Sequence, residues 1–138
     1  MGHALIASVL AAQDLTLAAA LEVPGASASG QDAGAPLGRT TGVTVGTDVD
    51  SALAQSDVLI DFTRPEGTVA HAAACARRGV ALVAGTTGLA PGHKAELAAH
   101  ARTVPIVHAP NMSVGVNVLG DLVQSAARAL DPAYDIEV

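Results

Sequence analysis

The chain has 138 residues, enough for one domain with a hydrophobic core, and half of these residues are hydrophobic. Phe62 and Tyr134 are the only aromatic residues, so burial has to come from thin, closely packed helix and sheet layers, which favours an α/β fold. A formal net charge of -6, the lack of a Lys/Arg cluster and the lack of an aromatic stacking surface argue against a nucleic-acid partner.

The first half of the chain predicts short elements separated by a long loop. Leu5, Ile6, Val9 and Leu10 have the spacing of a buried helix stripe. The loop that follows the first strand is rich in Gly, Ala, Ser and Pro. In order, the pattern predicts a helix over 2–13, a strand over 15–21, the loop over 22–42, a strand over 43–45, and a helix capped near Thr47 or Asp48 that runs to Gln55.

The stretch 58–68 predicts a strand, a polar loop and a helix start in close succession. Residues 58–60 are an unbroken apolar run, which favours a parallel strand covered on both faces. Pro65 suits the first helical position, with Thr63 or Arg64 where a cap would lie, and Gly79 is expected to end the helix. The apolar face of this helix is expected to comprise Val69, Ala72, Ala73 and Ala76.

The second half continues the alternation of strands and helices. The pattern predicts a strand over 80–84, the loop 85–88, a helix over 91–101, a strand over 104–108, a helix over 113–130 and a further strand from 134. This alternation indicates a doubly wound parallel sheet. No strand precedes the first helix and the last strand begins near the end of the sequence. We therefore expect an incomplete domain over 1–130, with 131–138 as the start of a second domain.

The cysteine and the histidines indicate neither a disulfide nor a metal site. Cys75 is the only cysteine, and its place in an alanine-rich helix predicts a packed thiol rather than a nucleophile. None of the histidines has metal-ligand spacing, so we predict no metal; surface or boundary roles are expected for His71, His93 and His100, whereas His108 lies nearest the presumed site. No apolar run approaches the roughly 20 residues that span a bilayer, and we expect a cytoplasmic protein without a membrane partner.

Five blocks in chain order carry a resemblance to a known enzyme family. They are MGHALI (1–6), LE (21–22), DFTRPEGT (61–68), GTTG (85–88) and APNMSVGVNV (109–118). Together they resemble the cofactor domain of 4-hydroxy-tetrahydrodipicolinate reductase, formerly called dihydrodipicolinate reductase, an NAD(P)H-dependent enzyme of lysine and diaminopimelate biosynthesis. The resemblance implies a Rossmann-like sheet that lacks its usual first strand.

The resemblance also implies where the adenosine half of the cofactor would bind. Met1 and Gly2 match only the end of the family's glycine-rich phosphate loop. Glu22 lies where a Rossmann carboxylate accepts hydrogen bonds from ribose hydroxyls, and its alternative is a solvated loop residue. Family members often have Arg next, where it pairs with the 2′-phosphate of NADP. Because Val23 cannot form that pair, the resemblance implies a preference for NADH over NADPH.

Three loops are implied to meet the nicotinamide half. Thr87 is also expected near the substrate. The GTTG run is equally consistent with an ordinary turn, and Arg64 with an ion pair to Glu66. Met112 stands where some members have Phe. The implied cofactor contacts are Phe62, Thr63 and Arg64 in the first loop, Gly85, Thr86 and Thr87 in the second, and Ala109, Pro110, Asn111 and Met112 in the third.

The family's reaction is hydride transfer to a cyclic dicarboxylate. Its catalytic His and Lys and its Ser-Gly-Thr substrate loop follow the strand that 134–138 would begin, so no catalytic residue is expected here and the chain is predicted to be inactive alone. Complete members are homotetramers. The alternative is a non-catalytic nucleotide- or CoA-binding domain of similar fold, or a structural or regulatory fragment.

Overall fold

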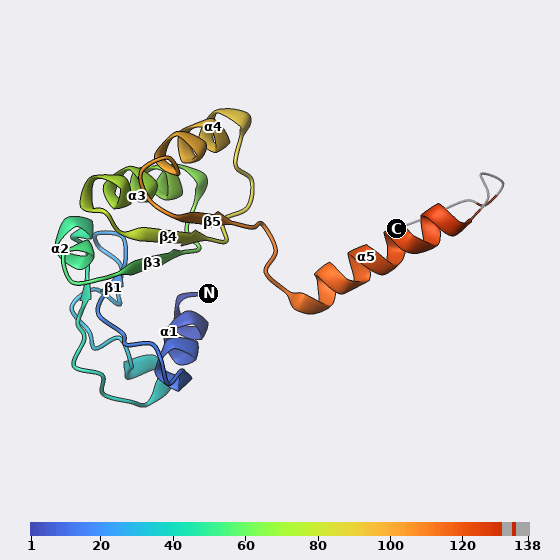
Figure 1. Ribbon diagram of the computed structural model, residues 1–138. Coiled ribbons are helices and arrows are strands. Elements are labelled where there is room, and N and C mark those ends of the chain that lie inside the picture. The colour runs from blue at the N-terminus through green and yellow to red at the C-terminus, as the bar shows by residue number, and fades with distance from the viewer. Residues whose placement is uncertain (131–133, 135–138) are drawn as a thin grey trace.

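The computed structural model describes residues 1–130 and Tyr134, so the predicted strand over 134–138 lies outside the described residues except for Tyr134. Helices and parallel strands alternate along the chain, which confirms the α/β prediction (Figure 1). The elements are α1 (Gly2–Ala11), β1 (Ala20–Leu21), the 3-10 turn η1 (Ala35–Leu37), β2 (Val45–Gly46), α2 (Val49–Leu53), β3 (Val58–Asp61), α3 (Pro65–Arg78), β4 (Ala81–Ala84), α4 (Pro91–His100), β5 (Ile106–His108) and α5 (Val114–Ala129).

The described strands form two separate parallel sheets. The first pairs β1 with β2, and the second has the order β3-β4-β5. The expected single sheet is thus divided between β1 and β3, which is where the central first strand of a doubly wound sheet would lie. All the named strand pairs are parallel, as a Rossmann-like domain requires.

Strand β1 is much shorter than the predicted strand over 15–21. Its ladder consists of only two residue pairs, Ala20 with Val45 and Leu21 with Gly46. An extended apolar segment is a strand only where its N–H and C=O groups form hydrogen bonds with a partner strand. The partner, β2, has only two residues, so β1 is equally short. The stripe on α1 is also less buried than expected, since its apolar side chains are half-buried and none of this helix is fully buried.

Strand β3 is covered on one face only, so the prediction of cover on both faces is wrong. Helices α3 and α4 lie side by side over one face of the β3–β5 sheet (Figure 1). On the other face Val58 is 49% exposed and Ile60 is 37% exposed. The apolar run was read correctly as a strand, but its composition cannot say how many helices pack on it.

The core lies between α3, α4 and the β3–β5 sheet. Leu82 and Cys75 are almost completely buried there, beside Ala72 and Leu97. Thr68, Ala72, Ala74 and Cys75 are the buried residues of α3, so the predicted face was correct at Ala72, whereas Val69, Ala73 and Ala76 are half-buried. Small side chains let α3 approach the sheet closely, and the bulk comes from leucines on the other elements.

The ends of α3 follow the predicted signals. Pro65 occupies the first turn, after an Arg64 N-cap whose side chain makes no capping bond. Gly79 ends the helix in the left-handed conformation with φ 73°, which glycine adopts without a Cβ penalty. These fixed ends place the 62–64 loop directly above the N-terminus of α3.

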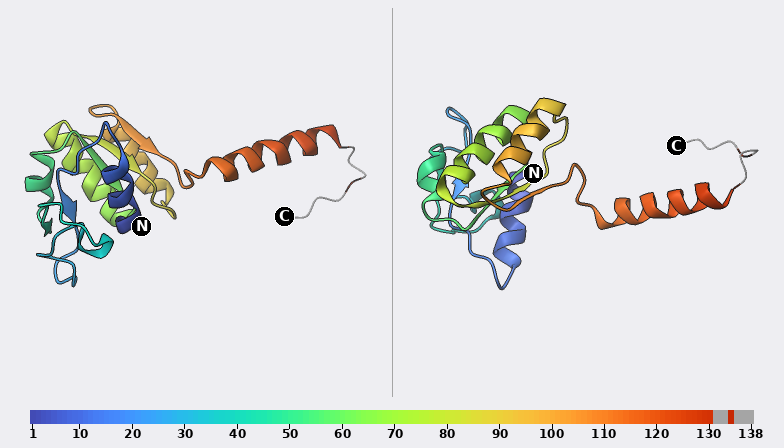
Figure 2. Two further views of the ribbon diagram at one scale, coloured as in Figure 1. Left: turned by 90° about the horizontal axis from the view of Figure 1, so that it is seen from below. Right: turned by 45° about the horizontal axis from the view of Figure 1, so that its top comes forward.

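Helix α5 projects away from the rest of the described chain (Figure 2). Its apolar side chains, Val114, Val116, Val118, Leu119, Leu122 and Val123, are exposed. The exposed face of α5 and the open face of the β3–β5 sheet thus leave apolar surface uncovered. Within residues 1–130, no helix has the length and apolar character needed to cross a membrane.

Candidate functional site

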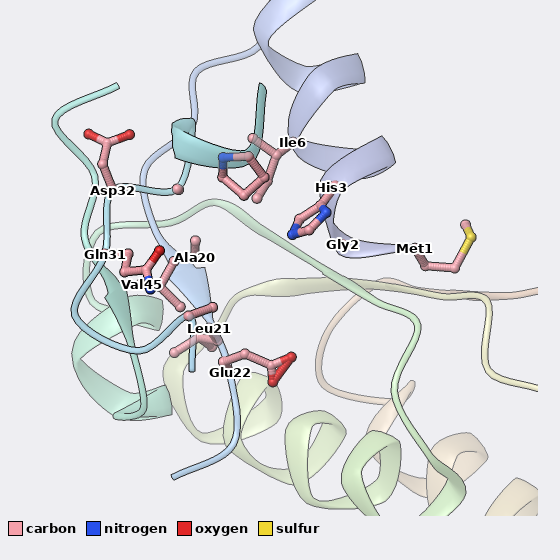
Figure 3. A pocket seen from close by; sticks show the side chains of 13 residues that line it. Met1, Gly2, His3, Ile6, Ala20, Leu21, Glu22, Gln31, Asp32 and Val45 are labelled. Carbon is pink, nitrogen blue, oxygen red and sulfur yellow. The ribbon is translucent and has the colours of Figure 1, made fainter. Parts of the chain in front are cut away.

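A pocket of about 220 Å³ opens between the start of α1 and the tip of β1 (Figure 3). His3 reaches toward it from the first turn of α1, and Glu22 follows the last residue of β1. Its lining residues are Met1, Gly2, His3, Ile6, Ala20, Leu21, Glu22, Ala28, Gln31, Asp32, Ala33, Pro36 and Val45. The pocket therefore brings together Met1, Gly2 and Glu22, which were the predicted residues of the adenosine end.

The long loop beside this pocket is held by Asp32. Its carboxylate accepts hydrogen bonds from the N–H groups of Gly34, Thr41 and Gly42 and from the Thr41 hydroxyl. The bonds from Thr41 and Gly34 outweigh desolvation and lower the pKa of Asp32 to about 2. Asp32 thus holds the two ends of segment 32–42 together, and this segment forms one wall of the pocket.

Glu22 is exposed at the tip of β1. Its Oε2 atom accepts a hydrogen bond of 2.9 Å from the backbone N–H of Val23, while its own N–H donates to the carbonyl of Gly46. Val23 is 67% exposed. The backbone is therefore fixed by β2, and the other carboxylate oxygen, which accepts no hydrogen bond from the described residues, can accept one from a ligand.

A second cluster forms at the carboxyl ends of β3, β4 and β5, where the three predicted loops begin. The ring of Phe62 lies against Gly85: a Cβ added to Gly85 would have three ring carbons within 2.6 Å. The N–H of Gly85 donates to the carbonyl of Asp61, and the N–H of Ala109 donates to the carbonyl of Ala84. The loops after β3, β4 and β5 are thus joined in sequence, as their positions at one sheet edge predict.

A series of hydrogen bonds between polar groups lies beneath the second and third loops. The hydroxyl of Thr68 on α3 donates a hydrogen bond of 2.7 Å to the hydroxyl of Thr86, and both side chains are buried. Nε2 of His108 lies 3.1 Å from the carbonyl oxygen of Thr86, so it donates there in the Nε2–H tautomer. The hydroxyl of Thr86 is therefore engaged inside the protein, whereas Thr87 is exposed.

Beneath the first loop, the buried carboxylate of Asp61 faces a histidine. Oδ1 of Asp61 accepts a hydrogen bond of 2.8 Å from the N–H of Thr63, and Oδ2 lies 3.4 Å from Nδ1 of His71. Burial raises the pKa of Asp61, but the neighbouring polar groups of His71, Thr63 and Thr68 outweigh it and bring the pKa to about 2. Asp61 is therefore a carboxylate at neutral pH.

Cys75 lies one turn of α3 beyond His71 and is completely buried. Burial, together with the negative charge of Asp61, raises the pKa of the Cys75 thiol to about 11. A thiol that stays protonated at neutral pH is a poor nucleophile. The prediction of a packed thiol at Cys75 is thus confirmed, and its raised pKa argues against a nucleophile.

The remaining predicted residues lie on the rim of the second cluster. Arg64 is exposed, and within the described part of the chain no carboxylate lies within the 4.0 Å of a salt bridge to it, so the alternative pairing with Glu66 is not formed. Asn111 accepts a hydrogen bond of 2.8 Å from the N–H of Ser113, which caps α5, while Pro110 and Met112 are exposed. No group of three or more His, Cys, Asp or Glu side chains in the described residues could hold a metal ion.

Sequence reasoning missed the residues that brace these loops. His71 was assigned a surface or boundary role, yet its Nδ1 atom is buried against Asp61. Thr68 and Asp32 were given no role, although each fixes a loop from below. A signal did exist for Asp32, because Asp two residues before Gly in a Gly-rich loop is typical of an Asx turn.

Parallel strands whose carboxyl-end loops form one cluster, beside a helix start and an acidic residue at the tip of β1, define a Rossmann-like nucleotide-binding domain. A family model described as dihydrodipicolinate reductase, N-terminus, matches residues 1–112. The chain belongs to this family, as the sequence resemblance indicated.

Curated relatives carry the name 4-hydroxy-tetrahydrodipicolinate reductase. The protein from Cupriavidus necator is 55% identical over the whole chain, which covers 52% of that relative. The protein from Bordetella pertussis is 52% identical with 51% of it covered, and that from Nitrosomonas europaea is 49% identical with 52% covered, each again over the whole chain. The chain thus spans about half the length of the curated relatives that it matches.

Proposed function

We propose that this chain supplies the cofactor-binding part of a 4-hydroxy-tetrahydrodipicolinate reductase that takes its hydride from NADH in the cytoplasm. The observation that carries the proposal is the clustering of the Phe62, Gly85 and Ala109 loops at one sheet edge, held together by backbone hydrogen bonds. The family membership and the reductase name of the relatives support the same reading.

The pocket at the start of α1 is proposed to take the adenosine end of the dinucleotide. Its volume of about 220 Å³ lies below the roughly 300–1,000 Å³ of a complete small-molecule site, which suits one end of a dinucleotide rather than all of it. Glu22 accepts hydrogen bonds from the ribose hydroxyls. Met1 and Gly2 bring the N-terminal end of α1, with its unpaired N–H groups, to the side of the pocket where phosphate would lie.

The charges around this pocket support the preference for NADH. Glu22 and Asp32 are its acidic lining residues, and among the described residues that line it none is Lys or Arg. A 2′-phosphate would therefore meet negative charge, with only the imidazole of His3 as a basic side chain. Val23, which is exposed beside Glu22, offers no hydrogen-bond donor from its side chain.

The second cluster is proposed to hold the nicotinamide end. When bound, the cofactor supplies a hydride to the carbon of the substrate's imine. Phe62 forms an apolar wall on Gly85, Met112 adds apolar contact from the third loop, and the exposed Thr87 lies on the rim for cofactor or substrate. Because the side chain of Thr86 is buried against Thr68, a contact from that position comes from the backbone.

Arg64, Thr63, Pro110 and Asn111 complete the proposed rim. The guanidinium of Arg64 is free to bind phosphate, ribose or a substrate carboxylate, and bidentate pairing with a carboxylate suits the dicarboxylate substrate of the family. The family's catalytic His and Lys have no counterpart in these loops. We therefore propose that residues 1–138 bind cofactor but do not catalyse the reduction alone, and that the complete enzyme is a homotetramer.

Isothermal titration of the chain with NADH, NADPH and CoA tests the proposal. We expect saturable binding of NADH that is tighter than that of NADPH, and none of CoA. Glu22→Gln should weaken NADH binding, whereas Glu96→Gln, an exposed carboxylate on α4, serves as the matched control. Binding of CoA without NADH would replace the proposal with a CoA-binding domain, and no binding at all would favour a structural fragment.

Val23→Arg tests the cofactor preference separately. An arginine beside Glu22 supplies the missing partner for a 2′-phosphate, so NADPH affinity should rise about tenfold while NADH affinity changes little. An unchanged ratio of the two affinities would refute the role assigned to position 23. Reductase assays on the same samples test the proposed lack of activity.

A further inference from the structure

We infer that His71 is a positioning residue that orients the carboxylate of Asp61 and, through it, the loop of Phe62, Thr63 and Arg64. The inference rests on the proposed function, in which this loop meets the nicotinamide end of the cofactor. His71 itself lies on α3, below the loop, and is not among the residues proposed to touch the ligand.

The contact between His71 and Asp61 is unusual in its burial. The side chain of Asp61 is only 1% exposed and that of His71 is 19% exposed. Nδ1 of His71 and Oδ2 of Asp61 are both buried atoms and lie 3.4 Å apart, within ion-pair distance, and neither forms an aligned hydrogen bond with any described residue. A buried carboxylate oxygen without a donor is destabilising, so each of these atoms requires the other.

This pairing fixes the tautomer of His71. A carboxylate can only accept, so the proton has to be on Nδ1 of the imidazole. With Oδ2 turned toward Nδ1 of His71, the other oxygen of Asp61 is directed to the N–H of Thr63, 2.8 Å away. The imidazole thereby selects one rotation of the carboxylate, and that rotation forms the turn at the start of the loop.

The effect extends to the neighbouring loop through the backbone of Asp61. Its carbonyl accepts the N–H of Gly85, and the ring of Phe62 lies on Gly85 itself. Thr68, one turn before His71 on the same helix, holds Thr86 in the second loop. Helix α3 thus braces two loops of the proposed site with two side chains that lie three residues apart, on one face of the helix.

The alternative is that His71 only fills space between α3 and β3. Two replacements separate these roles. Asparagine carries an N–H donor close to the place of Nδ1, so His71→Asn keeps the donor and loses part of the ring. Leucine keeps most of the volume and has no donor, so His71→Leu keeps the packing and leaves Asp61 Oδ2 unpaired.

The first test requires no ligand. Long-range ¹H–¹⁵N NMR spectra of the wild-type chain at pH 8 report which imidazole nitrogen of His71 carries a proton. We expect a proton on Nδ1, and a Thr63 amide signal shifted downfield by its bond to the carboxylate. The Thr63 signal should persist in His71→Asn and move upfield in His71→Leu. A bare Nδ1, or a Thr63 signal that is the same in all three proteins, would overturn the inference.

The second test measures NADH binding by titration of the same three proteins, with thermal unfolding to establish that each is folded. His71→Leu should weaken NADH binding about tenfold, the effect of leaving one buried donor–acceptor pair unmade, and His71→Asn should recover most of this loss. Equal affinity of His71→Leu and wild type refutes the positioning role. If the wild-type chain binds no dinucleotide, the proposed function fails, and the NMR result alone decides whether His71 orients Asp61.

Discussion

Replacing Gly85 with alanine should loosen the contact between the first two loops. Gly85 is buried and lies outside the left-handed region of backbone conformation, so alanine meets no backbone penalty and the effect is purely steric. Three carbons of the Phe62 ring would lie within 2.6 Å of the new Cβ, closer than the roughly 3.0 Å at which real Cβ contacts begin. Relief of such an overlap by shifts of a side chain and backbone costs about 1–3 kcal/mol.

Urea unfolding of Gly85→Ala, followed by circular dichroism, measures this loss. The midpoint should fall without a change in the denaturant slope, and the melting temperature should drop by roughly 3 °C per kcal/mol for a chain of this size. Gly46→Ala is the matched control, because a Cβ at Gly46 meets nothing within 4 Å. Its free energy of unfolding should change by less than about 0.5 kcal/mol.

A double variant identifies the ring as the cause. Phe62→Leu removes the two closest of the overlapping atoms, Cε1 and Cζ, so Gly85→Ala combined with Phe62→Leu should lose about 1 kcal/mol less than the sum of the single changes. The steric argument is refuted if Gly85→Ala is as stable as wild type, or if the two losses add. NADH titration of the same variants then shows whether a displaced Phe62 ring weakens binding.

Further predictions concern acid stability, a helix cap and the long loop. The folded pKa of Asp61, about 2, lies below the ordinary 3.8, so its carboxylate adds about 2 kcal/mol to the free energy of unfolding above about pH 4. This contribution is lost as the pH falls toward 2. Asp61→Asn should abolish this part of the pH dependence in urea unfolding at pH 2 to 7. Asp48→Ala removes the acceptor for the N–H groups of Asp50 and Ser51 at the start of α2, and should lower the free energy of unfolding by about 1 kcal/mol, with Asp57→Ala as the exposed control. Asp32→Ala should free Thr41 and Gly42 and raise their amide hydrogen exchange, while exchange in α3 stays unchanged; equal protection of the loop in both proteins would contradict its role as the loop's anchor.

The elements that could be predicted from sequence are those with local signals. Pro65 and Gly79 mark the two ends of α3, and the structure places them as expected because both act through backbone conformation at a single position. The strand over 15–21 was overestimated because strand length depends on the partner, and β2 offers only two residues. Local pattern carries no information about a distant partner.

The candidate site, too, could be predicted from the sequence only in part. The family resemblance implied that the loops of Phe62, Gly85 and Ala109 meet, and the structure brings them together because the parallel strands β3, β4 and β5 end at one sheet edge. The pairing of His71 with Asp61 could not be predicted, since it depends on how α3 is rotated over β3. If α3 were rotated about its axis by one residue position, the imidazole of His71 would face solvent. The carboxylate of Asp61 would then be buried without a partner.

The division of the strands into two sheets has a thermodynamic consequence. A ladder of two residue pairs opens readily, so the part of the chain around β1 and β2 should unfold in local excursions that leave the β3–β5 layer intact. A dinucleotide that contacts both the β1–β2 part and the β3–β5 layer would couple their folding, because its binding energy is available only while both are folded. Ligand would then convert two weakly coupled folding units into one cooperative unit.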